Sequence, residues 1–167
     1  GRGEGLGVPG ARVGGGGVAR RGGFWEARDG VGGPGPAPPV PVAGGGRSDA
    51  AARRAGGRGD GWLASWCSPE RFAKGVAVAA EAAAEAGRTK VTWRHGYQVW
   101  VGFGGTPEEG TDRLGPAIER FYGVPYEAFQ RYSPVGTPEE VAGWLRPFVD
   151  AGATDLNLAP VAGSPGE

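Results

Sequence analysis

Apolar residues follow two alternating patterns along the chain from residue 40 onward. Runs rich in β-branched and aromatic residues predict strands, and they cover residues 40–43, the neighbourhood of Trp62 and Leu63, residues 90–103 and residues 153–161. Between these runs, apolar residues recur with the spacing of one helix face, as in Phe72, Val76, Ala79, Ala80 and Ala83. Strands that alternate with helices in this way predict a parallel α/β architecture.

Capping signals mark where the first two predicted helices begin. Ser48 or Asp49 can accept hydrogen bonds from the first helical N–H groups, and we expect this helix to stop at Gly56. Residues 68–70 (SPE) combine a capping serine, a proline at the first helical position and an acid in the first turn. The helix that they start is expected to end at Gly87.

The sequence TPEE occurs twice, at residues 106–109 and 137–140, and places Glu three residues after Thr as in a capping box. Gly110, Gly115 and Pro116 follow the first copy, which predicts a short or broken helix there. An uninterrupted apolar stripe follows the second copy, which predicts a regular helix.

The N-terminal part of the chain is dominated by glycine. Residues 1–35 hold 15 of the 36 glycines and show almost no apolar periodicity. Residues 1–22 cannot bury enough apolar surface to offset the loss of backbone entropy, so they are predicted to be a disordered or non-native segment. Residues 23–167 are predicted to form one domain, since the chain is long enough for a single core only.

The charge balance and the scarcity of reactive residues narrow the function classes. Lys plus Arg and Asp plus Glu both total 18, so no net field favours nucleic acid or an anionic membrane. Cys67 and His95 are the only residues of their kinds, which excludes an intrachain disulfide and argues against a metal site. No apolar run reaches the roughly 20 residues of a membrane span, and no signal-peptide pattern opens the sequence. We therefore expect a cytoplasmic protein without metal, nucleic-acid or membrane partners.

Gly44, Gly45 and Gly46 stand between the first predicted strand and the first predicted helix. Glycine clusters mark sharp turns or places where the backbone approaches something closely. Backbone N–H groups in such a turn, followed by a helix N-terminus, suit a phosphate or the edge of a flavin. Arg47 can pair with a phosphate or remain solvated, and the glycines can equally serve the turn alone.

Other candidate residues also allow two interpretations. Trp62 and Trp66 can line a pocket, although tryptophans more often fill a core. Asp60 suits a turn better than a general base, and His95, within a predicted strand, is more readily packed than catalytic. Cys67 precedes a helix cap that can stabilise a thiolate, but a lone cysteine without a partner base is more often structural.

Three spaced segments resemble the C-terminal half of the luciferase-like monooxygenases. They are PVPVAGGGRSDAAARRAGGRGDGW at 39–62, SPERFAKGVAVAAEAAAEAGR at 68–88 and GTPEEVAGWLRPFVDAGATDLNLAPV at 136–161. This family consists of (β/α)8 TIM barrels that use FMN or the deazaflavin coenzyme F-420. The resemblance covers residues 24–163 and implies that the four predicted strands are barrel strands five to eight.

The resemblance implies an oxidoreductase that transfers hydride or activates oxygen through F-420 or FMN on a small organic substrate. It places Gly44, Gly45, Gly46 and Arg47 at the cofactor, with F-420 slightly favoured, and turns Trp62 and Ser65 toward the pocket mouth. Catalytic groups are expected in the first four barrel strands, which have no counterpart in this sequence. The catalytic residues are therefore left unassigned.

A second function class follows from the missing strands. A half-barrel can be a non-catalytic unit that serves only structure or oligomerisation. Its two outer strands would carry unpaired edges, so we expect either a closed eight-stranded homodimer or poor solubility.

Overall fold

The computed structural model describes residues 18–21, 26–30 and 40–163. Strands β1 (Val18–Arg21) and β2 (Glu26–Gly30) pair antiparallel in a small sheet of their own. The disorder predicted for residues 1–22 falls mostly outside the described residues.

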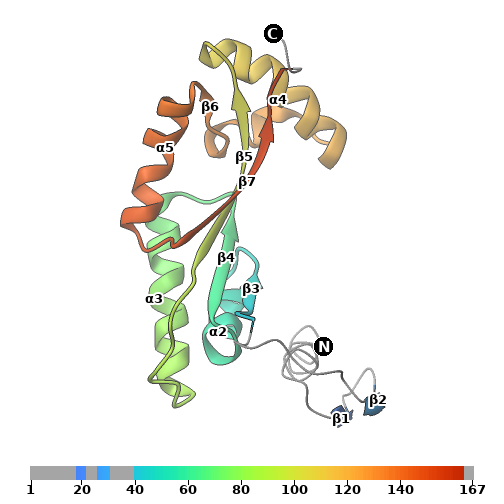
Figure 1. The fold of residues 1–167 in the computed structure, drawn as a ribbon, viewed down its shortest axis with the longest axis vertical. Helices are drawn as coiled ribbons and strands as arrows, with labels where there is room; N and C mark the ends of the chain where they lie inside the picture. Colours follow the sequence, from blue (N-terminus) through green and yellow to red (C-terminus); the bar gives the residue numbers. More distant parts are fainter. Residues whose placement is uncertain (1–17, 22–25, 31–39, 164–167) are drawn as a thin grey trace.

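A five-stranded parallel sheet and four helices make up the rest of the described chain (Figure 1). In chain order these elements are β3 (Ala43–Gly45), α2 (Asp49–Arg58), β4 (Gly61–Ser65), α3 (Pro69–Glu85), β5 (Gly96–Phe103), α4 (Pro107–Tyr122), the short 3-10 helices η2 (Tyr126–Ala128) and η3 (Gln130–Tyr132), β6 (Val135–Gly136), α5 (Pro138–Asp150) and β7 (Asp155–Val161).

The parallel α/β architecture predicted from the sequence is confirmed. Across the sheet the strands lie in the order β3, β4, β5, β7. Each strand pairs in parallel with the next one. The two-residue strand β6, which the sequence pattern does not reveal, pairs only with Gly102 and Phe103 at the carboxyl end of β5. The carboxyl ends of the parallel strands point in one direction but are staggered: Gly45 pairs with Leu63 and Ser65 pairs with Gln98, whereas β5 runs on to Phe103.

Two helices run further than the sequence pattern predicts. Helix α2 passes through Gly56 to Arg58, because Gly56 is the point where α2 and α3 touch: a Cβ there would overlap the carbonyl of Ala79. Helix α4 is continuous over 16 residues rather than short or broken. At Gly110 a Cβ would lie 2.6 Å from the carbonyl oxygen of Gly102, so glycine lets α4 approach β5 closely. Tertiary packing thus overrides the low helix propensity of glycine.

Strand boundaries also shift from the predicted ones. The first strand of the sheet covers Ala43–Gly45 instead of residues 40–43, so two of the three glycines lie inside it. The third predicted strand begins at Gly96 rather than near residue 90.

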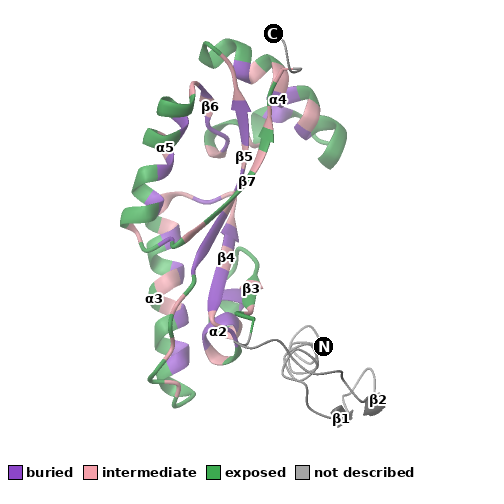
Figure 2. Cartoon of the chain, viewed as in Figure 1, coloured by how far each residue is buried: buried purple, intermediate pink, exposed green. Residues whose placement is uncertain are grey.

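The main core lies between the sheet and helices α3 and α5, which cover the same face of β4 and β5 (Figure 1). Trp62 of β4 is fully buried and stacks on Phe72 of α3 at 5.7 Å. Tyr97 of β5 stacks on Phe148 of α5 at 3.9 Å, and its hydroxyl donates to the carbonyl of Cys67. We call the face that carries Trp62 and Tyr97 the outer face. Burial is concentrated on β4 and β5, while β3 and β7 are largely exposed (Figure 2).

The alternation of side chains along β-strands assigns the opposite face, which we call the inner face. A Cβ at Gly96 would lie 2.8 Å from Cδ1 of Leu63 and 3.8 Å from Cβ of Asp155, so these three residues share it. Helix α4 packs on this face only at the carboxyl end of β5, where Leu114 and Ile118 build a second buried cluster.

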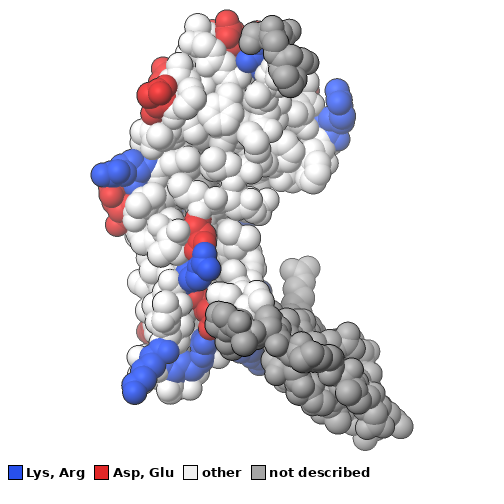
Figure 3. Space-filling view, in the orientation of Figure 1, with Lys and Arg blue, Asp and Glu red and all other residues white. Residues whose placement is uncertain are grey.

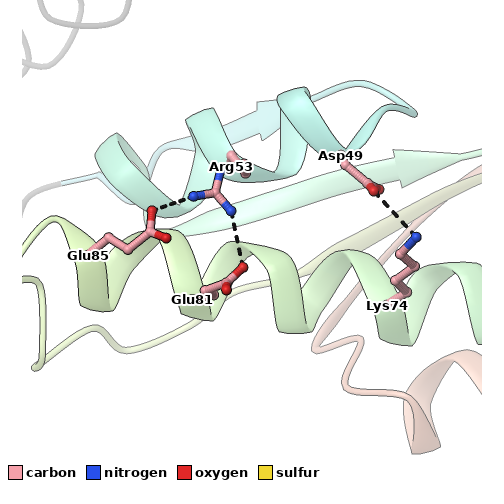
Figure 4. A network of polar contacts seen from close by, with 5 residues as sticks. All are labelled: Asp49, Arg53, Lys74, Glu81 and Glu85. Atoms are coloured by element: carbon pink, nitrogen blue, oxygen red, sulfur yellow. Dashed lines mark hydrogen bonds and ion pairs between the residues drawn. The ribbon is translucent and has the colours of Figure 1, made fainter.

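Ion pairs between exposed side chains join α2 to α3. Arg53 bridges Glu81 and Glu85, while Asp49 pairs with Lys74 at 3.4 Å (Figure 4). Because these pairs are largely exposed, each contributes at most about 1 kcal/mol. The close backbone contact at Gly56 governs the position of α2 on α3.

His95 is buried immediately before β5. Its Nδ1 accepts a hydrogen bond from the backbone N–H of Trp62 at 3.2 Å, which requires the proton of the neutral ring to be on Nε2. The ring stacks on Trp93, and Nε2 is buried without a hydrogen-bond partner. Desolvation lowers the pKa of His95 below its ordinary value of 6.5. Protonation of Nδ1 would also break its hydrogen bond, because the new Nδ1–H would face the backbone N–H of Trp62.

Replacing Gly75 tests the packing of Trp62 against α3. A Cβ at Gly75 would overlap the Trp62 indole, so Gly75→Ala is expected to lower the free energy of unfolding by about 2 kcal/mol through overpacking. Gly57 is also helical but has nothing within 4 Å of its Cβ position. Gly57→Ala should therefore raise stability, by up to about 1 kcal/mol. Urea denaturation measures the free energy of unfolding of both variants. Equal losses of stability in Gly75→Ala and Gly57→Ala would contradict this packing.

The buried neutral His95 predicts a pH-dependent stability. Since its folded-state pKa is depressed, the unfolded chain takes up the proton first, and stability falls as pH drops below about 6.5. One proton limits the slope to about 1.4 kcal/mol per pH unit. Thermal melts of the wild type and of His95→Gln between pH 5 and 8 measure the effect. The variant should lose the part of the pH dependence that comes from His95. Parallel curves of stability against pH for the two proteins would show that His95 is not the group responsible.

Candidate functional site

The predicted glycine turn lies at the carboxyl edge of the sheet, and its three glycines have different surroundings. Gly44 faces outward onto α2, where a Cβ would lie 2.9 Å from Cβ of Ala55. Gly46 has a φ of +134°, in the region that favours glycine, and a Cβ there would also crowd Ala51 at 2.8 Å. Gly44 and Gly46 are therefore explained by packing and by backbone conformation.

Gly45 is the glycine without a structural explanation. Its partner across the β3–β4 ladder is Leu63, an inner-face residue, so a side chain at Gly45 would point to the inner face. The nearest atom to its Cβ position is the carbonyl oxygen of Leu63, 4.0 Å away, and its φ is not positive. Open space beside a glycine at this edge is compatible with the close approach of a ligand.

The turn is held rigidly from the outer side. The indole N–H of Trp62 donates to the carbonyl of Gly46 at 2.8 Å, and Gly46 N–H donates to Leu63 at 3.3 Å. Arg71 of α3 donates to the carbonyl of Arg47 at 2.7 Å and lies over the Trp62 ring at 5.5 Å. Trp62 thus supports the turn from within the core, and its fully buried side chain does not face a pocket mouth as the resemblance implied.

A groove of about 620 Å³ follows β3 and the first turns of α2. It is lined by Ala43, Gly44, Gly45, Gly46, Arg47, Ser48, Ala51, Arg54 and Ala55. The structure thereby adds Arg54 to the predicted Arg47 beside the glycine turn. Ser48 caps α2 by accepting a hydrogen bond from the N–H of Ala51.

Ser65 ends β4 on the inner face, two residues after Leu63. Its predicted place at the mouth of a substrate pocket stays a prediction. Trp66 follows with a φ of 53°, the one positive value at a non-glycine residue in the part of the chain that the structure describes. Such backbone costs about 1–3 kcal/mol, which surrounding contacts must offset.

An aromatic wall at the carboxyl end of the inner face receives Trp66. We use this name for Trp66, Trp100, Phe121, Tyr122 and Phe129. Trp66 lies 4.4 Å from Phe129 between ring centres, and the Trp100 indole donates to the Tyr122 hydroxyl at 3.1 Å. No local sequence pattern predicts this wall, since it depends on the unbroken α4. The adjacent Phe121 and Tyr122 near the end of that helix were the available signal.

Two of the acid–base candidates lie at the other end of the sheet. Asp60 and His95 immediately precede β4 and β5. Asp60 accepts the N–H of Val42 at 3.0 Å and faces Arg88, so its carboxylate ties the start of β4 to the segment before β3 rather than fixing a local turn. Cys67 is buried, and desolvation raises the pKa of its thiol to about 11, so the helix cap does not yield a thiolate at neutral pH.

The described residues contain no cluster of three or more His, Cys, Asp or Glu side chains suited to a metal ion. Over the same residues, no helix combines the length and apolar character needed to cross a bilayer. Acidic and basic side chains are interspersed on the face shown in Figure 3.

Comparison with solved structures places this arrangement among known folds. An F-420-dependent secondary alcohol dehydrogenase, solved with an F-420–acetone adduct, superposes with a TM-score of 0.74 at 16% identity, covering 89% of this chain and 51% of its own. The F-420-dependent tetrahydromethanopterin reductase from Methanopyrus kandleri gives a TM-score of 0.69 at 15% identity over 92% and 55% of the two chains. A monooxygenase from Streptomyces bottropensis gives 0.66 at 19% identity over 96% and 54%.

The chain thus spans about half the length of these solved relatives. No curated protein matches the sequence. The family model for luciferase-like monooxygenases matches residues 13–132, which is most of the chain and begins inside the glycine-rich N-terminal segment. The chain therefore belongs to the luciferase-like monooxygenase family.

Proposed function

We propose that this chain carries part of the cofactor site of an F-420- or FMN-dependent oxidoreductase acting on a small organic substrate. The observation that carries the proposal is Gly45, whose inner-face side opens onto free space at the carboxyl edge of the sheet. Family membership supplies the cofactor class. Solved proteins of the same fold include F-420-dependent enzymes and an FMN complex.

The residues around Gly45 fit a planar, phosphate-bearing group. Gly45 and Gly46 offer backbone that a ligand can approach closely, and Arg47 offers a cation beside it. The aromatic wall and Ser65 lie further toward the carboxyl ends of β4 and β5 on the same face, and aromatic rings provide stacking surface for a ring system. When bound, the cofactor would supply hydride transfer or oxygen activation.

In the proposed site, the role of this chain is to hold and orient the cofactor. Trp62 and Arg71 fix the carbonyls of Gly46 and Arg47 from behind, so the turn keeps its shape without a ligand. Such preorganisation reduces the entropy that binding must overcome.

A non-catalytic half-barrel is the second candidate function. The high thiol pKa of Cys67 and the placement of His95 and Asp60 at the amino ends of their strands favour it. The two candidates differ in one measurable property, which is the binding of a flavin or deazaflavin.

Cofactor titration of the purified chain, followed by fluorescence, tests the proposal directly. We expect binding of F-420 or FMN, and Gly45→Val should raise the dissociation constant by about tenfold or more through steric contact. Because the Cβ position at Gly45 is open and its φ is not positive, the melting temperature should stay unchanged.

Gly44→Ala serves as the matched control for this substitution. Its added methyl group crowds Ala55 on the outer face, so the variant should melt at a lower temperature and bind normally while folded. Absence of binding by the wild-type chain, or equal affinity in Gly45→Val, would reject the cofactor role and leave the non-catalytic one.

A further inference from the structure

A row of polar side chains crosses the inner face of the sheet. Ser65 pairs with Gln98 in the β4–β5 ladder, and Gln98 pairs with Asn157 in the β5–β7 ladder. Directly paired residues project from the same face, so all three side chains stand on the inner face with Ser65. Neighbouring strands lie about 4.8 Å apart, which makes the row about 10 Å long with Gln98 at its centre. We call these three residues the polar row.

The inner-face residues on either side do not provide hydrogen-bonding partners for the polar row. Toward the amino ends of the strands, the neighbouring row consists of Leu63, Gly96 and Asp155. The carboxylate of Asp155 is already held by Arg94, whose Nε donates to it at 3.2 Å. Toward the carboxyl ends, the next inner-face residue of β5 is Trp100 of the aromatic wall.

The polar groups of the row are unused. Over residues 18–21, 26–30 and 40–163, no group hydrogen-bonds to the side chains of Ser65, Gln98 or Asn157. Ser65 and Gln98 are half-buried, whereas Asn157 is exposed. Each carboxamide has an oxygen that accepts and an NH₂ group that donates, and a hydroxyl does both. A few polar groups among apolar and aromatic side chains are what orient a ligand in a binding site.

We propose that the polar row binds the imide edge of a planar ring, in which one N–H lies between two carbonyl groups. The inference rests on the proposed function and deepens it, since flavins and deazaflavins both carry this edge. The Gln98 carboxamide matches it, because its oxygen can accept from the imide N–H while its NH₂ group donates to a neighbouring carbonyl. The row bears no charge, so it suits a neutral imide, whereas a phosphate suits Arg47.

The place of the polar row agrees with this role. Along β4, Ser65 follows Leu63, the ladder partner of Gly45, by two residues or about 7 Å. Along β5, Trp100 follows Gln98 by the same distance. The polar row therefore lies between the level of Gly45 and the aromatic wall. A ring stacked on the wall can turn its polar edge toward Gln98.

Fluorescence titration of the full chain tests the proposal with lumiflavin, 5-deazalumiflavin and the 3-methyl derivative of each. The first two contain the ring system without a phosphate chain, and the 3-methyl derivatives lack the imide proton. We expect the wild type to bind at least one parent ring about tenfold more tightly than its 3-methyl derivative, which is the effect of one hydrogen bond. Gln98→Leu should lose about tenfold in affinity for the parent ring and no longer distinguish the two.

Gln130→Leu is the matched control for this substitution. Gln130 lies in η3, outside the sheet, and is exposed. Its replacement removes the same carboxamide group and should leave both affinities as they are in the wild type. FMN and F-420 are titrated alongside, so that binding of the whole cofactor is measured on the same samples.

Nuclear magnetic resonance of the wild type keeps the test decisive if Gln98→Leu fails to fold. Gln98, Gln130 and Asn157 are the only carboxamide side chains of the sequence, so their NH₂ signals are readily separated in an amide spectrum. Addition of the parent ring should shift the NH₂ signals of Gln98 more than those of Gln130.

The outcomes separate this inference from the proposed function. Equal affinity of Gln98→Leu and the wild type for the parent ring, or an unchanged preference over the 3-methyl derivative, would overturn the role of the polar row and leave the cofactor role standing. Binding of FMN or F-420 without binding of either parent ring would do the same. Absence of binding by every compound would overturn both.

Discussion

The fully buried side chain of Trp62 is the interaction on which the rest of the structure depends. Its ring fits where α3 has only Gly75, stacks on Phe72 and lies beneath Arg71. Its indole N–H holds the carbonyl of Gly46. One tryptophan therefore fixes the distance between β4 and α3 and the shape of the glycine turn together. A change in the core at this position would be transmitted to the carboxyl edge of the sheet.

Side-chain alternation then separates the tasks of neighbouring residues. Along β3, Gly44 meets α2 on the outer face, whereas Gly45 opens to the inner face. Along β4, Trp62 belongs to the core and Ser65 to the inner face at the carboxyl end. The outer face governs stability, and the inner face bears the candidate site. Substitutions one residue apart can thus have unrelated effects.

Much of the architecture could be predicted from the sequence because local signals agreed with the tertiary fold. Ser68 caps α3 and Thr137 completes the capping box of α5, as their spacing indicated. The signals failed where glycine had a packing role. Gly56 was interpreted as a helix stop but is the close contact with Ala79, and Gly110 was interpreted as a break but lets α4 approach β5.

The sequence by itself determined the order of the main helices and strands (without β6), the parallel sheet, the family and the location of the glycine turn. These properties follow from periodicity, capping and spaced motifs, which are local along the chain. Only the tertiary structure decided which face each residue takes: that Trp62 is core, that Gly45 alone of the three glycines is open, and that Trp66 joins an aromatic wall with α4. These outcomes depend on register and on contacts between residues distant in sequence, which no local pattern encodes.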